Sequence, residues 1–298
     1  MEVRDTSSVN GFAAAAARIG DTPQPFREIL WQRIPKAEAV RQLIFSPAFV
    51  AGKFQALASV LCVTDRRWLV LLGQNDGRIT VDEAVYDTTL LVELTIILLY
   101  GQVKIHFVAN RETRTATLQF NTVMQRTYSS AIQAILDAID GKEHAAPKPD
   151  WIRSPMISGW PLKFRNFAII YVPEKSHLLD GVCWKEIRGS FNRELGPAAA
   201  LVLTDRHIVL IAEEKGTGWF QFRQQTKHGA VMTYFPLDRL ADFHIKARKR
   251  FSILELEGHQ NQGKGKIEVM IPTDKQEVVA RLIGRRAGRS PLQPSKCF

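Results

Sequence analysis

The sequence predicts a mainly β fold of the α+β class, built from two tandem copies of one small unit. Residues 61–72 have a counterpart 140 positions later, at 201–212, and both stretches read as an apolar strand, a Thr-Asp-Arg turn and a second apolar strand. Further matches follow in the same order, and each copy closes with apolar residues at helical spacing. We therefore expect about seven antiparallel strands and one C-terminal helix in each copy, with the strands forming a strongly bent sheet or partly open barrel.

The matches downstream of the turn keep their order at a larger offset. Residues 91–96 pair with 240–245, and residues 104–107 pair with 253–256, each 149 positions later. The offset of 140 has therefore grown by nine, which predicts nine extra residues in the second copy.

Two helices are expected, one at the end of each copy. Their apolar residues recur at helical spacing over 127–140 and 273–285. They are Ala131, Ile132, Ile135, Leu136 and Ile139 in the first copy and Val278, Val279, Leu282 and Ile283 in the second.

Composition divides the chain into two domains and three connecting or terminal segments. The ends are rich in small and polar residues, and the region between the copies contains four prolines, which is typical of a semi-rigid linker. The predicted segments are a flexible N-terminal segment at 1–25, a first domain at 26–141, a Pro-rich linker at 142–162, a second domain at 163–286 and a flexible tail at 287–298.

Two stretches of the second copy resemble the bacterial pleckstrin-homology-like (PH-like) and GRAM-type families. They are Val202-Leu203-Thr204-Asp205-Arg206 and Phe235-Pro236-Leu237-Asp238-Arg239-Leu240. The first copy keeps the former pattern but not the latter. The resemblance covers roughly 30–140 and 165–285, and it implies a bent seven-stranded sheet closed at one end by the helix. Members of these families are mostly non-catalytic and bind lipids, peptides or other subunits, so the resemblance does not choose a ligand.

Motifs for catalysis, metals and cofactors are absent from the sequence. It has no HExxH, GxSxG, phosphate-loop or dinucleotide-binding pattern, and its seven histidines are dispersed. The three cysteines, Cys62, Cys183 and Cys297, are too scattered for a disulfide framework or a zinc site. Glu255 and Glu257 alternate with leucines on a strand, which indicates a solvated outer face. We expect no enzyme activity, no catalytic residues, no metal and no cofactor.

The net charge of +10 comes entirely from the second half of the chain. Residues 1–150 contain 16 basic and 16 acidic residues, whereas residues 151–298 contain 24 and 14. A basic run, Lys246-Ala247-Arg248-Lys249-Arg250, lies between two expected strands and would place Lys246, Arg248 and Arg250 on one face if extended. Lys264 and Lys266 are expected nearby across a hairpin. These six cations form either an anion-binding patch or a solvated edge that opposes aggregation.

The extra residues of the second copy contain the other candidate site. Trp219, Phe220 and Phe222 lie there beside Arg223 and Lys227. Aromatic and basic side chains in an enlarged loop fit an interface with a partner, although they also fit packing on the neighbouring domain.

Two functions remain from the sequence alone. The first is a scaffold that binds another protein, or a second copy of itself, through the second domain. The alternative is a peripheral module that binds anionic phospholipid headgroups through the basic patch. Nucleic-acid binding is a weaker expectation, because a basic patch alone gives only nonspecific binding. With no secretion signal at the N-terminus, we expect a cytoplasmic protein, at the inner face of the membrane in the alternative.

Overall fold

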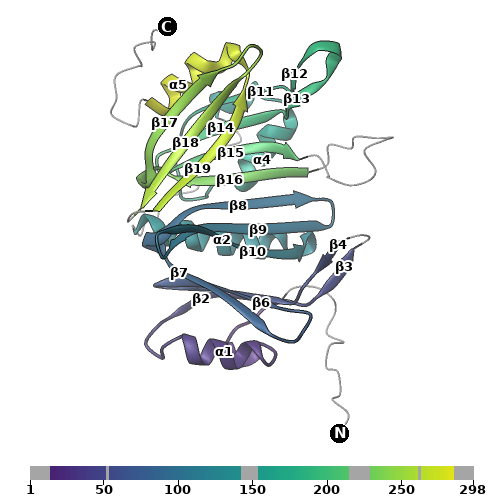
Figure 1. Cartoon of the computed structure of the whole chain (residues 1–298), viewed down its shortest axis with the longest axis vertical. Helices are drawn as coiled ribbons and strands as arrows, with labels where there is room; N and C mark the ends of the chain where they lie inside the picture. The colour runs from purple at the N-terminus through teal and green to yellow at the C-terminus, as the bar shows by residue number, and fades with distance from the viewer. Residues whose placement is uncertain (1–13, 52–53, 142–153, 215–228, 261–262, 285–298) are drawn as a thin grey trace. The chain divides into compact units, whose positions relative to one another are not determined.

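The structure is a computed structural model that describes residues 14–51, 54–141, 154–214, 229–260 and 263–284 (Figure 1). The chain divides into two compact units, Met1–Glu143 and His144–Phe298. Both are mainly β, with antiparallel sheets and a few short helices, as the sequence predicts. None of the sheets in the described ranges closes into a barrel.

The first unit contains two antiparallel sheets that follow one another along the chain. The first sheet has the strand order β1-β2-β5-β6-β7, and the second is the meander β8-β9-β10. A small hairpin, β3–β4, extends from the first sheet. The bounds are β1 Ala14–Ala15, β2 Val40–Ser46, β3 Phe49–Ala51, β4 Phe54–Ala56, β5 Ser59–Thr64, β6 Arg67–Gly73, β7 Ile79–Val85, β8 Thr89–Ile97, β9 Tyr100–Ala109 and β10 Glu112–Asn121.

Two helices cover this unit. Helix α1 (Phe26–Arg33) lies along one face of the first sheet (Figure 1), where Phe26 and Leu30 join a buried cluster with residues of β2, β5 and β6. Helix α2 (Gln125–Asp140) follows the 3-10 turn η3 (Thr122–Met124) and buries six side chains along one face. Burial of these apolar faces is the main favourable contribution to folding of the unit.

Aromatic side chains connect the second sheet and α2 to the first sheet. The Trp68 ring on β6 meets Phe107 on β9 edge-on, with ring centroids 5.0 Å apart. Phe120 on β10 stacks on Tyr128 of α2 at 3.9 Å, and the Tyr128 hydroxyl is 2.6 Å from Ser46 Oγ on β2. The core of the first unit therefore lies between both sheets and α2.

The second unit repeats this order of elements. Helices α3 (Pro155–Ser158) and α4 (Leu162–Tyr171) precede the sheet β11-β14-β15-β16, which is followed by the meander β17-β18-β19 and helix α5 (Gln276–Gly284). Strands β12 and β13 form a small hairpin. The bounds are β11 Leu178–Trp184, β12 Ile187–Arg188, β13 Glu194–Gly196, β14 Ala199–Thr204, β15 His207–Glu214, β16 Gly229–Pro236, β17 Leu240–Ala247, β18 Ser252–Gln260 and β19 Gly263–Ile271.

The two C-terminal helices are confirmed, whereas α1 and α4 were not predicted. Helix α2 buries every one of the five apolar residues expected to face the core, and α5 buries Val279, Leu282 and Ile283. Regular structure also occurs in segments expected to be flexible or to link the domains. Strand β1, which pairs with β2, lies within the predicted N-terminal segment 1–25. Helix α3 and the first residue of α4 lie within the predicted linker 142–162.

Strand register gives an offset of 151 downstream of the insertion, instead of the predicted 149. His207 is 140 positions after Arg67, but its partner Pro236 is 151 positions after Arg67's partner Val85. Val92 on β8 pairs with Ile105 on β9. The residues 151 positions later, on β17 and β18, also pair with each other. The stretch from β15 to β16 is therefore eleven residues longer than its counterpart: nine lie in the connection, as predicted, and one in each of the two strands.

Candidate functional site

Both Thr-Asp-Arg sequences form the tight turn between two paired strands, as predicted. Thr64 Oγ1 accepts hydrogen bonds from the backbone N–H groups two and three positions ahead, at 3.2 and 3.0 Å. Thr204 Oγ1 accepts the equivalent pair at 3.1 and 2.7 Å. Threonine suits this position because its hydroxyl replaces backbone bonds that the turn leaves unmade.

The aspartate of each turn binds the chain segment that precedes the first sheet. Asp65 Oδ1 accepts from Ala39 N–H at 3.2 Å, and Asp65 N–H donates to Ala39 O at 2.9 Å. Asp205 makes the same two bonds with His177, at 2.7 and 3.0 Å. The two units therefore build this turn with equivalent hydrogen bonds, which supports the internal repeat. These residues satisfy backbone groups and are not arranged for chemistry.

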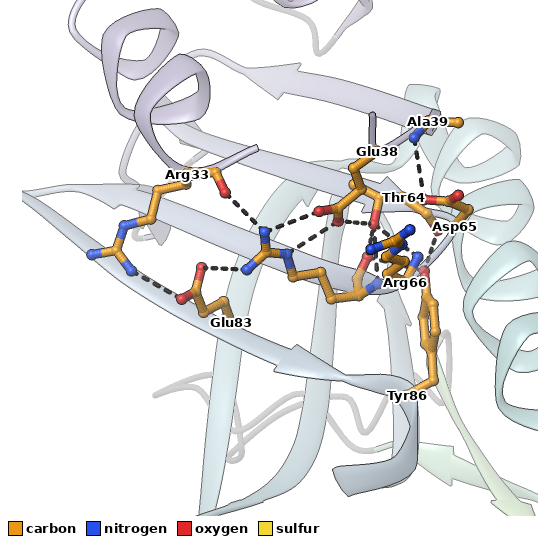
Figure 2. Close-up of polar contacts among 9 residues, drawn as sticks. Arg33, Glu38, Ala39, Thr64, Asp65, Arg66, Glu83 and Tyr86 are labelled. Carbon is orange, nitrogen blue, oxygen red and sulfur yellow. Dashed lines mark hydrogen bonds and ion pairs between the residues drawn. The ribbon is translucent and has the colours of Figure 1, made fainter. Parts of the chain in front are cut away.

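A half-buried ion-pair network surrounds the first of these turns (Figure 2). Arg67 binds Glu38 through two hydrogen bonds, with Nε 3.1 Å from Oε1 and Nη2 2.9 Å from Oε2. Thr64 Oγ1 lies 2.6 Å from Glu38 Oε1. Arg67 Nη2 also donates to the Arg33 carbonyl at the end of α1, at 2.8 Å. The network thus ties α1 and the following segment to the β5–β6 turn.

Charges within this network balance. Arg33 pairs with Glu83 at 3.0 Å, and Glu83 also lies 3.9 Å from Arg67, so two arginines face two glutamates. Burial acts to raise the pKa of Glu38, but hydrogen bonds from Arg67 and Thr64 outweigh it and hold the pKa below its ordinary value. A network that neutralises itself stabilises the fold and leaves no net charge for a ligand.

The second unit replaces this ion pair with a neutral pair. Ser176 stands 138 positions after Glu38, and His207 stands 140 positions after Arg67. Ser176 Oγ lies 3.4 Å from His207 Nδ1, and both residues are buried. Burial, with a smaller contribution from the nearby Arg206 charge, lowers the pKa of His207 to about 3. The imidazole is therefore neutral at physiological pH.

The basic run predicted from sequence forms a turn rather than an extended strand. Strand β17 ends at Ala247, and Arg248 N–H donates to Phe251 O at 2.8 Å to close the turn before β18. The expectation that Lys246, Arg248 and Arg250 share one face of an extended segment is therefore wrong, because the chain reverses direction there. We call Arg248, Lys249 and Arg250 the cationic turn.

All three side chains of the cationic turn are exposed. Within the described ranges, no carboxylate forms an ion pair with any of them. Unlike the network around Arg67, this group of charges is not neutralised by the described residues of its unit.

The other predicted cations differ from the cationic turn. Lys246 and Lys266 do converge, as expected from the hairpin, but both bind Glu255, at 2.8 and 2.9 Å. Lys266 also pairs with Glu268 at 2.8 Å. Hydrogen bonds from the two lysines hold the pKa of Glu255 below its ordinary value. Lys264 belongs to β19, opposite His259, but its side chain lies outside the described part of the structure.

Glu255 lies on the outer face of the sheet, opposite the buried Leu254 and Leu256, as expected, but its side chain is covered by two exposed lysines. Its side chain is only 4% exposed, because it lies on the central strand β18 between lysines of β17 and β19. No local sequence signal identifies it, since its partners come from two other strands. For Glu38 and Arg67 a signal exists, because both positions change together between the copies, to Ser176 and His207.

The aromatic candidate site cannot be placed on the fold. Trp219, Phe220, Phe222, Arg223 and Lys227 all lie in 215–228, outside the described residues. Their segment is the connection between β15 and β16 that the register shows to be longer than its counterpart.

The described residues contain no group of three or more His, Cys, Asp or Glu side chains positioned to hold a metal ion. Burial raises the pKa of the Cys62 thiol to about 12 and also raises the pKa of Cys183. A thiol with a raised pKa is a poor nucleophile near neutral pH. In the parts of the chain that the structure covers, no helix is both long and apolar enough to cross a membrane.

Comparison with known proteins adds no identification. No protein-family model matches the sequence, and no curated protein matches it.

Proposed function

We propose that this chain is a non-catalytic binding module made of two PH-like units, and that its second unit binds an anionic membrane surface through the cationic turn. The PH-like assignment is supported by the order of elements in each unit. A strongly hydrogen-bonded first sheet, a three-stranded meander and one amphipathic helix follow one another twice. The equivalent bonds of Asp65 and Asp205 support it further.

The observation that carries the binding proposal is the lack of neutralisation at the cationic turn. Elsewhere in the described part of the unit, Lys163 pairs with Glu213 at 3.0 Å, and Lys246 and Lys266 share Glu255. Three adjacent exposed cations without carboxylate partners attract an anionic surface and repel one another when no such surface is present.

A lipid leaflet suits this turn better than a protein partner does. A stable protein interface buries about 800 Å² on each side, which is far more than one three-residue turn provides. An anionic leaflet needs only that basic side chains approach it, and each contributes about 1 kcal/mol. Three cations then give about 3 kcal/mol, so the turn provides selectivity for anionic lipid and part of the affinity.

Charge reversal at the turn tests this function. We expect that Arg248→Glu, Lys249→Glu and Arg250→Glu together abolish co-sedimentation with vesicles of phosphatidylcholine containing one third phosphatidylserine. Wild-type protein should bind these vesicles at low salt and less at high salt, because salt screens exposed charges. The stability of the variant should be unchanged within about 0.5 kcal/mol, since exposed charges contribute little to folding.

A matched control separates the turn from net charge. Lys36, Arg41 and Arg111 are exposed cations of the first unit, and changing all three to Glu alters the net charge equally. The control should bind anionic vesicles nearly as well as wild type. Equal binding of wild type to neutral and anionic vesicles, or equal losses in both variants, would contradict the proposal and favour a protein partner at the Trp219 segment.

A gain of binding is expected from Glu255→Gln. The substitution leaves the size of the side chain nearly unchanged but removes the negative charge that Lys246 and Lys266 share. Lys246, on the strand that leads into the cationic turn, then loses its carboxylate partner and adds to the positive charge there, whereas Lys266 keeps Glu268. Affinity for phosphatidylserine vesicles should rise several-fold, by about 1 kcal/mol. Vesicle titration at low salt measures this, and unchanged or weaker binding would show that Lys246 does not face the lipid.

A further inference from the structure

The turn between β8 and β9 in the first unit has an unfavourable sequence for its conformation. Ile97 pairs with Tyr100, so only Leu98 and Leu99 connect the two strands. Leu98 adopts a left-handed backbone conformation with φ of 51°. Two-residue hairpin turns favour Asn and Gly, because a branched side chain is strained at positive φ. The next turn of the same meander does place an asparagine, Asn110, at φ of 53°.

Both leucines of this turn point into solvent. Leu98 is 65% exposed and Leu99 is 60% exposed. Val123, which is 62% exposed, lies beside them, because its neighbour Thr122 donates to the carbonyls of Leu99 at 3.2 Å and Leu98 at 2.7 Å. We call Leu98, Leu99 and Val123 the apolar tip.

The two segments that build the apolar tip lack negative charge. Neither 94–103 nor 118–131 contains Asp or Glu, and their single charged residue is Arg126, which is exposed. At the base of the tip, Tyr100 is half-buried and its hydroxyl accepts a hydrogen bond from Gln102 at 2.9 Å. An amphipathic aromatic ring next to exposed aliphatic side chains is typical of residues at a membrane–water interface.

The apolar tip and the cationic turn occupy equivalent places in the two units. Each lies at the connection between the first two strands of the three-stranded meander, and each is followed by a 3-10 turn and the C-terminal helix, η3 and α2 in one unit and η8 (Thr273–Lys275) and α5 in the other. The same position therefore carries two exposed leucines in one unit, with Val123 of η3 beside them, and three exposed cations in the other.

We infer that the apolar tip inserts its leucines into the apolar zone of the anionic bilayer that the second unit binds. This inference rests on the proposed function and supplies the affinity that the cationic turn lacks. Three side chains on a hairpin turn are too few for a stable protein interface or a dimer. They are enough for a bilayer, where each aliphatic group adds to partitioning independently. The lack of Asp and Glu in the two segments that build the tip, 94–103 and 118–131, suits the negative charge of the leaflet.

The turn offers a substitution that removes the leucines without harming the hairpin. Leu98→Gly with Leu99→Asn places glycine at the one position of this turn with positive φ, which two-residue turns of this type favour. We expect the melting temperature of the double variant to stay equal to that of wild type or to rise. Its partitioning onto phosphatidylserine-containing vesicles should fall about tenfold or more, because two large aliphatic side chains no longer leave water. The binding that remains should depend more steeply on salt.

A matched control and a direct readout complete the test. Leu162 and Ile170 on α4 are 61% and 58% exposed, and changing both to Asn removes similar apolar area from another surface. This control should bind as wild type does. In a Leu99→Trp variant, the tryptophan emission should shift to shorter wavelength when anionic vesicles are added.

The outcomes separate the two proposals. Vesicle binding that depends on the cationic turn but not on the apolar tip overturns this inference and leaves the proposed function standing. Failure of wild type to bind any vesicle overturns both. A Leu98→Gly/Leu99→Asn variant that changes the oligomeric state in light scattering, without changing vesicle binding, would show that the tip contacts a second copy and would also overturn the inference.

Discussion

Lowering the pH from about 7 to about 5 is expected to destabilise the second unit by about 2 kcal/mol, through the single residue His207. The pKa of His207 is about 3 in the folded protein, against an ordinary value of 6.5. Between pH 6.5 and 3, the His207 imidazole therefore binds a proton in the unfolded chain but stays unprotonated in the folded unit. The stabilisation is complete above that value and is lost, as the pH falls towards 3, at about 1.4 kcal/mol for each unit of pH.

Hydrogen exchange followed by mass spectrometry measures this effect within the unit. Protection of peptides from β14 and β15 should fall between neutral and mildly acidic pH. The glutamine of a His207→Gln variant does not titrate. Whatever the stability of this variant at neutral pH, it should change much less than that of wild type over the same pH interval. A variant that keeps the full pH dependence of wild type would assign the lost stability to another group.

Breaking the pair of Glu38 and Arg67 is expected to destabilise the first unit by about 2–3 kcal/mol. Glu38→Ser leaves a half-buried guanidinium without its main acceptor, and Arg67→His leaves a buried carboxylate without its bidentate donor. The double variant reproduces the combination Ser176 and His207 of the second unit. It should cost about 1–2 kcal/mol less than the sum of the two single changes, because neither charge remains alone.

Denaturant unfolding of the two single variants and the double variant tests this coupling. Arg33→Gln is the control, because the Arg33 side chain is nearly half-exposed and binds Glu83 at the edge of the network. It should change the free energy of unfolding by less than about 0.5 kcal/mol. Strictly additive losses would mean that Glu38 and Arg67 act separately and that the serine–histidine pair is not their equivalent.

Periodicity in the sequence was sufficient for the elements that have a strongly apolar face. The helices at the ends of the two units and the strands around both Thr-Asp-Arg turns follow from spacing alone. Helices α1 and α4 were missed because both are short and have weakly separated apolar and polar faces. Prolines also flank them, at Pro25 and Pro35 and at Pro161 and Pro173, and indicate loops when tertiary packing is unknown.

The error in the downstream alignment has a physical cause. Side chains of a strand alternate between two faces, so a slip of two residues returns every apolar residue to the same face. Offsets of 149 and 151 therefore give equally good apolar patterns. The backbone pairing decides for 151, because β8 and β17 each carry an irregularity directly after their first paired residue, Thr89 and Leu240.

Charged residues of the candidate site could be predicted in part. Sequence identified the basic run and the hairpin that brings Lys246 and Lys266 together. It could not show that Glu255 lies between them, because the partner of a residue on a central strand depends on the registers of two neighbouring strands. The apolar tip was also missed, since two leucines at the end of an apolar run look like a continuation of the buried strand.

The buried position of Cys62 allows a thiol reagent to measure the opening of the first unit. Cys62 lies on β5 in the core of the first unit, and Cys183 lies on β11 of the second, and both thiols have raised pKa values. With Cys297 changed to Ser, a thiol reagent can reach Cys62 only when the first unit opens. The rate of modification at Cys62 then reports the opening of the first unit in the intact chain under native conditions, whereas Cys183, which is only partly buried, does not report opening of the second unit.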